Sequence, residues 1–277
     1  MRATLPGSLR LLLLAALGLA GLLTFMAFTL ALNGYQLTER EPARRLLERA
    51  LAALTDVDAA LPALQESLRE EGQRAEGTTL TVPDFPVPVE VMREEALTLE
   101  GEGLRQVLLR RGAQALYRQG TSALLSDPDA SRRLERTSMP WALEQGLGLI
   151  TQDTHRHLLV AMIALGALFL VLLLAPLLLT RPLWGKVAVL GGVLLVASLP
   201  PLAVAIGARF FLRAAQSDAE PFVYELLQVG IEAMTVPIRN YLTLSALGSG
   251  LLAVAAAMVW AESRTRAPAL TGGEDAA

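Results

Sequence analysis

Long stretches of apolar residues dominate the pattern along the chain. Four of them lack Asp, Glu, Lys, Arg and His altogether: residues 11–32, 158–179, 187–208 and 241–261. A helix rises about 1.5 Å per residue and the hydrocarbon core of a bilayer is roughly 30 Å thick, so about 20 apolar residues span it. Each stretch therefore predicts a transmembrane helix.

The first stretch has an alternative interpretation as a cleaved signal peptide, because Arg2 and Arg10 precede it. The apolar core of a signal peptide is about 7–15 residues long, and a small-residue cleavage site follows it. Residues 11–32 form a longer run, and no clear site of this kind precedes Asn33. We therefore expect the first stretch to remain as a helix.

Basic residues near the ends of the apolar stretches predict their orientation, because Lys and Arg are enriched in cytoplasmic loops. The residues concerned are Arg2, Arg10, Arg181, Lys186, Arg264 and Arg266. They predict cytoplasmic termini at residues 1–10 and 262–277 and a cytoplasmic turn at 180–186. Residues 33–157 and 209–240 are then expected on the outer side of the plasma membrane, in a cell of bacterial type.

The segment 33–157 has the periodicity of a small helical domain. After Thr38, apolar residues recur at steps of three and four: Leu46, Leu47, Ala50, Leu51 and Leu54. Thr38 and Glu41 have the spacing of a capping box, which predicts the start of a helix. Pro62 lacks a backbone donor and predicts a kink or a break in this helix.

The remainder of this segment predicts further helices around one extended stretch. Gly72 and Gly77 predict the end of the first helical element. Three prolines make residues 78–91 an extended connector with room for a short edge strand. Helix is expected to resume near Arg93, and an apolar stripe that begins at Leu104 predicts that it continues to about Leu125. The run 138–157 is helical in pattern, and we expect it to continue unbroken into the second membrane helix.

The second outer segment, residues 209–240, contains an amphipathic pattern. Its apolar face is formed by Phe222, Val223, Leu226, Leu227, Ile231 and Met234. Such a helix either lies on the membrane surface or packs against the outer domain. Its polar face is acidic and would be repelled by anionic lipid, which favours packing.

Composition removes several classes of function. Of the 277 residues, 53% are hydrophobic and 18% are charged, and the net charge is −3, so the chain has no basic patch suited to nucleic acid. The chain has no cysteine, which excludes disulfides, thiolate nucleophiles and cysteine metal sites. No phosphate-binding, dinucleotide-binding or zinc-protease motif occurs, so no cofactor is predicted.

Three residues just before the second membrane helix have side chains that can bind a metal. They are Asp153, His155 and His157, and the two histidines are the only ones in the chain. On a helix Asp153 and His157 share a face, whereas His155 points away from them. Zinc needs three or four ligands, so a polar collar at the membrane surface is the simpler interpretation. A metal-dependent membrane enzyme stays a lesser alternative.

Adjacent prolines in the third apolar stretch predict an irregular helix. Pro200 and Pro201 follow Ser198 near its middle, and each proline removes a backbone hydrogen bond. Broken helices mark substrate sites in some transporters. Because no charged residue accompanies these prolines, a kinked structural helix is the simpler interpretation. Transport or lipid handling through this break remains an alternative function.

Small residues within the apolar stretches predict close helix packing. They let the backbones of neighbouring membrane helices approach each other. The candidates are Gly18, Gly21, Gly191, Gly192, Ser245, Ser249 and Gly250.

These features predict an all-α membrane protein, with four transmembrane helices and a small helical extracytoplasmic domain inserted between the first two. The order of segments is similar to that of permease subunits of some ABC-type transporters, but the turn 180–186 offers little surface for an ATPase. The predicted function is non-enzymatic. The outer domain is expected to bind or sense a ligand or partner, as a scaffold, an accessory subunit or a signal-coupling element. The expected partners are the lipid bilayer and another membrane or extracytoplasmic protein.

Overall fold

The structure is a computed structural model that describes residues 7–55, 57–83, 85, 87–123, 148–180, 182–217, 219 and 221–266. The described residues are predominantly helical. The chain divides into two compact units. The apolar unit comprises Met1–Asn33, Val160–Gly207 and Thr235–Ala277, and the polar unit comprises Gly34–Leu159 and Ala208–Met234.

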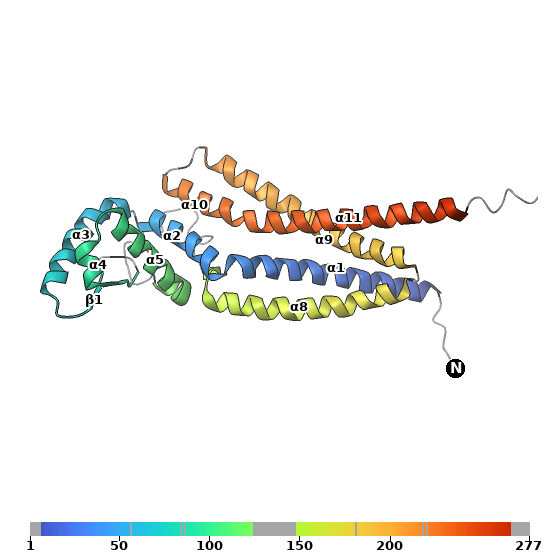
Figure 1. Ribbon diagram of the computed structural model, residues 1–277, viewed down its shortest axis with the longest axis horizontal. Coiled ribbons are helices and arrows are strands. Elements are labelled where there is room, and N and C mark those ends of the chain that lie inside the picture. Colours follow the sequence, from blue (N-terminus) through green and yellow to red (C-terminus); the bar gives the residue numbers. More distant parts are fainter. Residues whose placement is uncertain are drawn as a thin grey trace, which may run out of the picture. The chain divides into compact units, whose positions relative to one another are not determined.

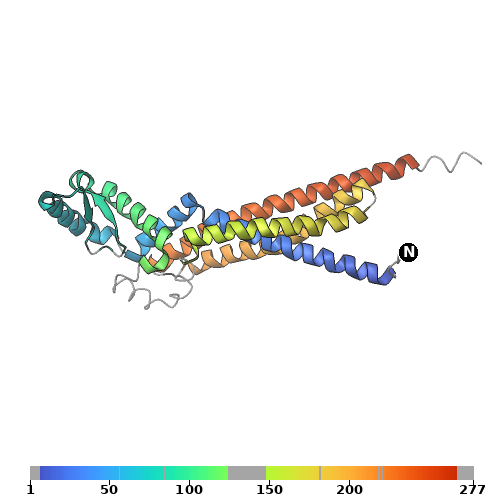
Figure 2. The same cartoon turned by 90° about the horizontal axis from the view of Figure 1, so that it is seen from below.

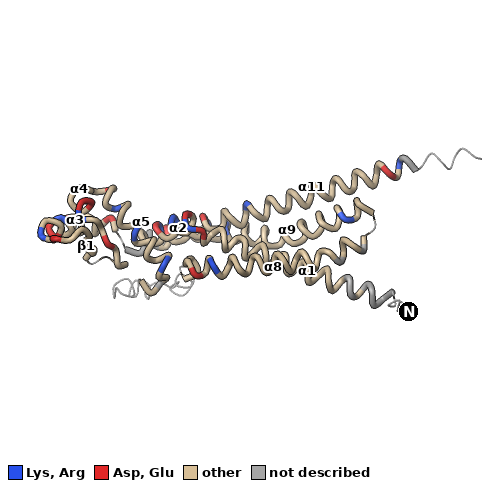
Figure 3. The backbone as a smooth tube through the Cα atoms, turned by 60° about the horizontal axis from the view of Figure 1, so that its bottom comes forward, with Lys and Arg blue, Asp and Glu red and all other residues tan. Residues whose placement is uncertain are grey.

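The apolar unit is built from four long helices, α1 (Gly7–Leu37), α8 (Gln152–Leu179), α9 (Leu183–Ala215) and α11 (Thr235–Arg266). They run lengthwise together in Figure 1 and Figure 2. In the described part of the chain, these four helices include spans long and apolar enough to cross a membrane, which confirms that prediction. The tube in Figure 3 carries Lys, Arg, Asp and Glu near the ends of these helices and few along them.

The interior of the apolar unit is a small cluster of large side chains. Its buried members are Phe25 on α1, Phe169 and Leu173 on α8 and Ala197 on α9. The rings of Phe25 and Phe169 lie 4.6 Å apart between centroids. Many Leu, Val, Ile and Phe side chains on the outer faces of the helices are exposed. Exposed apolar surface of this extent is unfavourable in water and is suited to lipid.

Polar pairs join the helices of the apolar unit near both ends. At one end the Trp184 indole of α9 donates to Glu262 of α11 at 2.9 Å. Within α11, the Arg264 guanidinium lies 3.8 Å from the ring centroid of Trp260. Towards the other end of α11, the Asn240 amide donates to the side chain of Asn33 at 2.7 Å. Trp at helix ends is typical of the membrane–water interface.

The polar unit contains α2 (Arg40–Thr55), α3 (Val57–Arg74), α4 (Arg93–Thr98), α5 (Glu102–Gln119), the short 3-10 helix η1 (Gly120–Ala123) and α10 (Pro221–Ala233). The apolar faces of α2, α3, α4 and α5 form one core, with members including Leu47, Leu51, Leu68, Leu104 and Leu108. The apolar stripe after Thr38 thus faces the core, apart from Leu54, whose side chain is outside the described set. Gly101 and Gly120 bound α5 with φ of +49° and +68°, values that favour glycine.

Residues 78–91 form more than an extended connector. β1 (Thr79–Thr81) pairs antiparallel with β2 (Glu90–Met92), with Leu80 opposite Val91. The prolines therefore fall between the strands, where no ladder donor is needed. This hairpin lies beside α3 and α5 in Figure 2. In the part of the chain that the structure describes, the polar unit is mostly helical with a two-stranded sheet, and the short strand allowed for in this stretch is present as one half of a hairpin.

The break expected at Pro62 falls elsewhere. α3 passes through Pro62 without interruption, and the helices separate between Thr55 and Val57. Pro62 lies near the start of α3, and the carbonyl that it leaves without a helical donor belongs to exposed Asp58, where water can bind it. Gly72 does not end the helix. It is buried against Leu97 and Leu80, where a larger side chain would crowd the hairpin.

Three other helix limits differ from the sequence prediction. The helix expected from about Arg93 is divided, because α4 ends at Thr98 and α5 begins at Glu102, after Gly101 with its positive φ. α5 ends at Gln119, since Gly120 takes a positive φ, and Leu125 lies outside the described residues. The run expected to enter the second membrane helix unbroken bends at Ile150 and Thr151, and its part before residue 148 also lies outside them. Thr151 caps the new helix, because its hydroxyl accepts from the backbone N–H of Thr154 at 3.2 Å.

The amphipathic segment forms α10, which packs against α2 within the polar unit. Leu227 and Ile231 on its apolar face are buried, and Glu232 forms an ion pair with Arg49 of α2. Packing, which the acidic polar face favoured, is therefore the observed arrangement.

Candidate functional site

The three residues that suggested a metal do not face a common point. His155 packs inward on α8, whereas the Asp153 side chain is 79% exposed and its carboxylate lies 3.9 Å from Arg156. His157 is exposed as well. Within the described residues, no group of three or more His, Cys, Asp or Glu side chains is placed to hold a metal ion.

His155 instead forms part of a hydrogen-bonded junction in the polar unit. Its ring stacks on Tyr35 at 4.4 Å between centroids, and its Nδ1 lies 3.1 Å from the Thr38 hydroxyl. The same hydroxyl donates to the carbonyl of Gly34 at 2.8 Å. Because a hydroxyl has a single hydrogen, we assign Nδ1 as the donor to the Thr38 oxygen. Thr38 therefore caps the end of α1 and contacts the start of α8, and it is not the capping box of α2.

Tyr117 brings α5 to the same point. Its hydroxyl donates to the backbone carbonyl of Thr38 at 2.9 Å. Burial raises the pKa of Tyr117 above its ordinary value of 10.0, while the positive charge of Arg40 lowers it and Glu39 raises it. Tyr117 thus keeps its proton and its donor role at neutral pH. The junction of Tyr35, Thr38, Tyr117 and His155 joins the end of α1, α5 and the start of α8.

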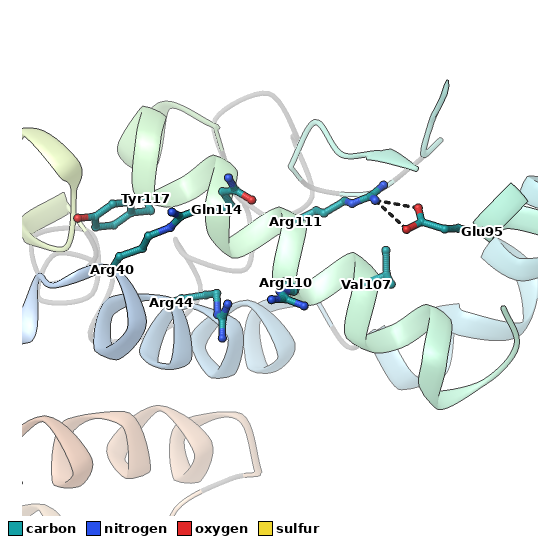
Figure 4. Close-up of a pocket in the computed structure, with 8 residues that line it drawn as sticks. All are labelled: Arg40, Arg44, Glu95, Val107, Arg110, Arg111, Gln114 and Tyr117. Carbon is teal, nitrogen blue, oxygen red and sulfur yellow. Dashed lines mark hydrogen bonds and ion pairs between the residues drawn. The ribbon is translucent and has the colours of Figure 1, made fainter. Parts of the chain in front are cut away.

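Tyr117 also borders a pocket of about 320 Å³ between α2, α4 and α5. We call it the arginine pocket, and its lining residues are Arg40, Arg44, Glu95, Val107, Arg110, Arg111, Gln114 and Tyr117. In Figure 4 Arg40 and Arg44 extend from α2, and Arg110 and Arg111 extend from α5. Spacings of three and four residues place Val107, Arg110, Arg111 and Gln114 on one face of α5.

Two of the four arginines are engaged with carboxylates. Arg111 contacts both oxygens of Glu95, at 2.8 and 2.9 Å, as the dashed lines in Figure 4 mark. Arg44 lies 2.8 Å from Glu41 and 3.2 Å from Glu48, both on its own helix. The buried Nε atom of Arg44 is the one that lies 3.2 Å from Glu48, as an ion pair without the geometry of a hydrogen bond.

The other two arginines of the pocket have no such partner. Among the residues that the structure describes, neither Arg40 nor Arg110 forms an ion pair or a hydrogen bond. Since Glu95 is the one acidic side chain in the lining and is matched by Arg111, the positive charge of the pocket is not neutralised from within. The pocket is therefore chemically suited to an anion.

The adjacent prolines do not break their helix. α9 continues through Pro200 and Pro201, and the side chain of Ser198 is buried at 1% exposure. Its hydroxyl lies 2.8 Å from the hydroxyl of Ser245 on α11. The broken helix on which the transport alternative depended is thus absent, because the helix conformation persists on both sides of the two missing donors. Ser198 contributes to helix packing.

The small residues divide into those at a close contact and those on open faces. Gly191 and Gly248 lie where α9 and α11 approach each other closely: a Cβ on Gly248 would lie 2.8 Å from the carbonyl oxygen of Gly191. Ser245 is buried beside them, and Gly21 is buried with Leu172 of α8 as its neighbour. No atom would lie within 4 Å of a Cβ at Gly18, Gly192 or Gly250, and Ser249 is exposed.

Sequence reasoning missed the arginine pocket, the Thr38 junction and Gly248. Arg40 with Arg44, and Arg110 with Gln114, have the four-residue spacing of one helix face, which was a usable local signal. No local signal shows that the two faces meet. No protein-family model, curated protein or solved structure matches the chain, so its function is inferred from these contacts.

Proposed function

We propose that the protein is a non-enzymatic signal-coupling element of the plasma membrane of a bacterial-type cell. In this proposal the polar unit lies on the outer side, both termini are cytoplasmic, and a ligand bound by the polar unit alters the membrane helices. The basic residues at the ends of the apolar stretches support this orientation. The described helices and their exposed apolar faces support the membrane location.

The observation that carries the proposal is the junction around Thr38. Tyr117 borders the arginine pocket, and its hydroxyl donates to the carbonyl of Thr38. The Thr38 hydroxyl in turn holds Gly34, in the last turn of α1, and His155, in the first turn of α8. α1 and α8 are each continuous helices that extend into the apolar unit. A change at Tyr117 is therefore placed to shift the ends of two predicted membrane helices together.

Coupling of this kind is testable without knowing the ligand, because the chain has no native cysteine. Spin labels are placed on Leu23→Cys of α1 and Leu170→Cys of α8, whose side chains are 57% and 62% exposed. The distance between the labels is measured in the full chain by double electron–electron resonance. Thr38→Val removes the hydroxyl while keeping the shape, and we expect it to shift or broaden the distance distribution.

The matched control is Thr243→Val on α11. The Thr243 hydroxyl also donates to a carbonyl four residues earlier, that of Arg239, but it is exposed and remote in sequence from the junction. We expect this variant to leave the distribution unchanged. An unchanged distribution in both Thr38→Val and Tyr117→Phe would refute coupling through the junction.

A further inference from the structure

The arginine pocket holds more positive charge than its acidic neighbours offset. Four arginines and one carboxylate line the pocket, and that carboxylate is already held by Arg111. Arg44 is shared between two carboxylates of α2. Arg40 and Arg110 remain, approaching from opposite helices without a counter-ion in the described part of the chain. Both side chains are exposed, so water screens their mutual repulsion, and they are accessible to an anion from solution.

We propose that the arginine pocket binds a phosphoryl group. A phosphate monoester carries a charge of about −1.5 to −2 near neutral pH and presents three strong acceptor oxygens. Arg40 and Arg110 supply a matching charge of two, and each guanidinium presents several donors in a fixed plane. The Gln114 amide lines the same pocket and supplies an uncharged donor.

A carboxylate matches this donor set less well. It carries a single charge, so it would balance the charge of only one of the two unpaired arginines. Glu95, the carboxylate of the lining, contacts one arginine, Arg111, with both of its oxygens and also accepts from the backbone N–H of Met92. Arg40 and Arg110 remain available to a group that carries more charge than a carboxylate.

The size and the walls of the pocket indicate a phosphomonoester larger than free phosphate. A volume of about 320 Å³ is at the lower end of the range of small-molecule sites. Val107 and the Tyr117 ring add apolar and aromatic surface beside the arginines. A soluble phosphomonoester and a phospholipid headgroup share this chemistry. Occupation of the pocket would contact Tyr117, so this inference identifies the ligand class of the proposed coupling function and rests on it.

The test is isothermal titration calorimetry of the full chain in detergent with inorganic phosphate, glycerol 3-phosphate and acetate at equal ionic strength. We expect glycerol 3-phosphate to bind at least as tightly as phosphate, and both to bind tighter than acetate by about tenfold or more. Arg110→Gln should weaken phosphate binding roughly ten- to hundredfold, the usual worth of a hydrogen bond to a charged group. Arg118→Gln is the matched control, since Arg118 is exposed on α5 and does not line the pocket.

Nanodiscs of phosphatidylcholine, with and without phosphatidic acid, identify the source of the phosphoryl group. If phosphatidic acid in the nanodisc weakens the binding of glycerol 3-phosphate, the natural ligand is a lipid headgroup. If it does not, the natural ligand is a soluble phosphomonoester. The proposal would be overturned if acetate and phosphate bind equally tightly, or if neither binds. It would also be overturned if Arg110→Gln and Arg118→Gln weaken phosphate binding equally. If no phosphate binding is detected but Thr38→Val still changes the distance distribution between the spin labels, the proposed ligand class is wrong and the coupling function stands. If phosphate binds but Thr38→Val leaves the distance distribution unchanged, the coupling function is wrong and the ligand class stands.

Discussion

The close contact between Gly191 and Gly248 leads to a prediction about stability, and other glycines on the same two helices serve as controls. A Cβ at Gly248 would lie 2.8 Å from the carbonyl oxygen of Gly191 and 2.8 Å from the backbone nitrogen of Leu195. A Cβ at Gly191 would lie 2.9 Å from the carbonyl oxygen of Gly248. These neighbours are backbone atoms, which cannot rotate away. Alanine at either position must therefore push α9 and α11 apart.

The magnitude follows from two opposing effects. Alanine in place of glycine within a helix stabilises it by roughly 0.5–1 kcal/mol, and overpacking a tight contact costs about 1–3 kcal/mol. Gly250 and Gly192 lie on the same two helices, and nothing lies within 4 Å of a Cβ at either position. Gly250→Ala and Gly192→Ala thus share the helix term and lack the clash. We expect Gly248→Ala to be less stable than Gly250→Ala by about 1–3 kcal/mol.

The assay is reversible unfolding of the purified chain in mixed micelles with increasing sodium dodecyl sulfate, followed by circular dichroism and tryptophan fluorescence. Gly191→Ala is compared with Gly192→Ala in the same way. The double variant Gly191→Ala/Gly248→Ala should lose less than the sum of the single losses, because the first separation of the helices relieves the second clash. Equal stabilities within both glycine pairs would refute the close approach of α9 and α11.

Three further predictions concern the cores and the junction. Leu108→Ala should lower the free energy of unfolding by about 2–5 kcal/mol, because Leu108 is fully buried. Gln106→Ala on the exposed face of the same helix should change the free energy of unfolding little, and equal effects of the two substitutions in thermal unfolding would contradict the core assignment. A double-mutant cycle with Ser198→Ala and Ser245→Ala should give a coupling near 0.6 kcal/mol, the usual value between membrane helices, and zero coupling would contradict the hydroxyl pair. The raised pKa of Tyr117 means that the folded chain keeps the phenol proton where the unfolded chain has lost it, so this contribution to stability is full below about pH 10 and falls as the pH rises further. Arg40→Gln should raise this pKa further, measured as the phenolate absorbance lost in Tyr117→Phe, and a lowered value would contradict the placement of Arg40.

The four long helices were predictable because exclusion of charge from hydrocarbon acts on every residue of a span. Their ends are marked in the sequence as well: residues 187–208 lie between Lys186 and Arg209 and measure about 33 Å along a helix. The packing faces were not predictable to the same degree. A helix that is apolar on all sides has no stripe to indicate which face contacts a neighbour, so Gly248 was missed and Gly250 was chosen.

The candidate site was hidden by distance along the chain. Thr38 and His155 are 117 positions apart, and Arg40 and Arg110 line the same pocket from two different helices. The sequence prediction of a capping box at Thr38 rested on Glu41 alone, but the Thr38 hydroxyl is already used by Gly34 and His155. Whether the Thr38 hydroxyl bonds a neighbour in sequence or a distant residue depends on the tertiary fold. A local sequence pattern does not contain that information.

The orientation of the chain in the membrane is the claim on which the proposed function depends most directly. Because the chain has no cysteine, single cysteines report the side of the membrane without background labelling. Gln73→Cys is on the exposed face of α3 and Ser263→Cys is exposed near the end of α11. On intact cells, a membrane-impermeant maleimide should label Gln73→Cys at once and Ser263→Cys only after permeabilisation. Labelling of Ser263→Cys on intact cells, with Gln73→Cys protected, would contradict the orientation and the outer binding site with it.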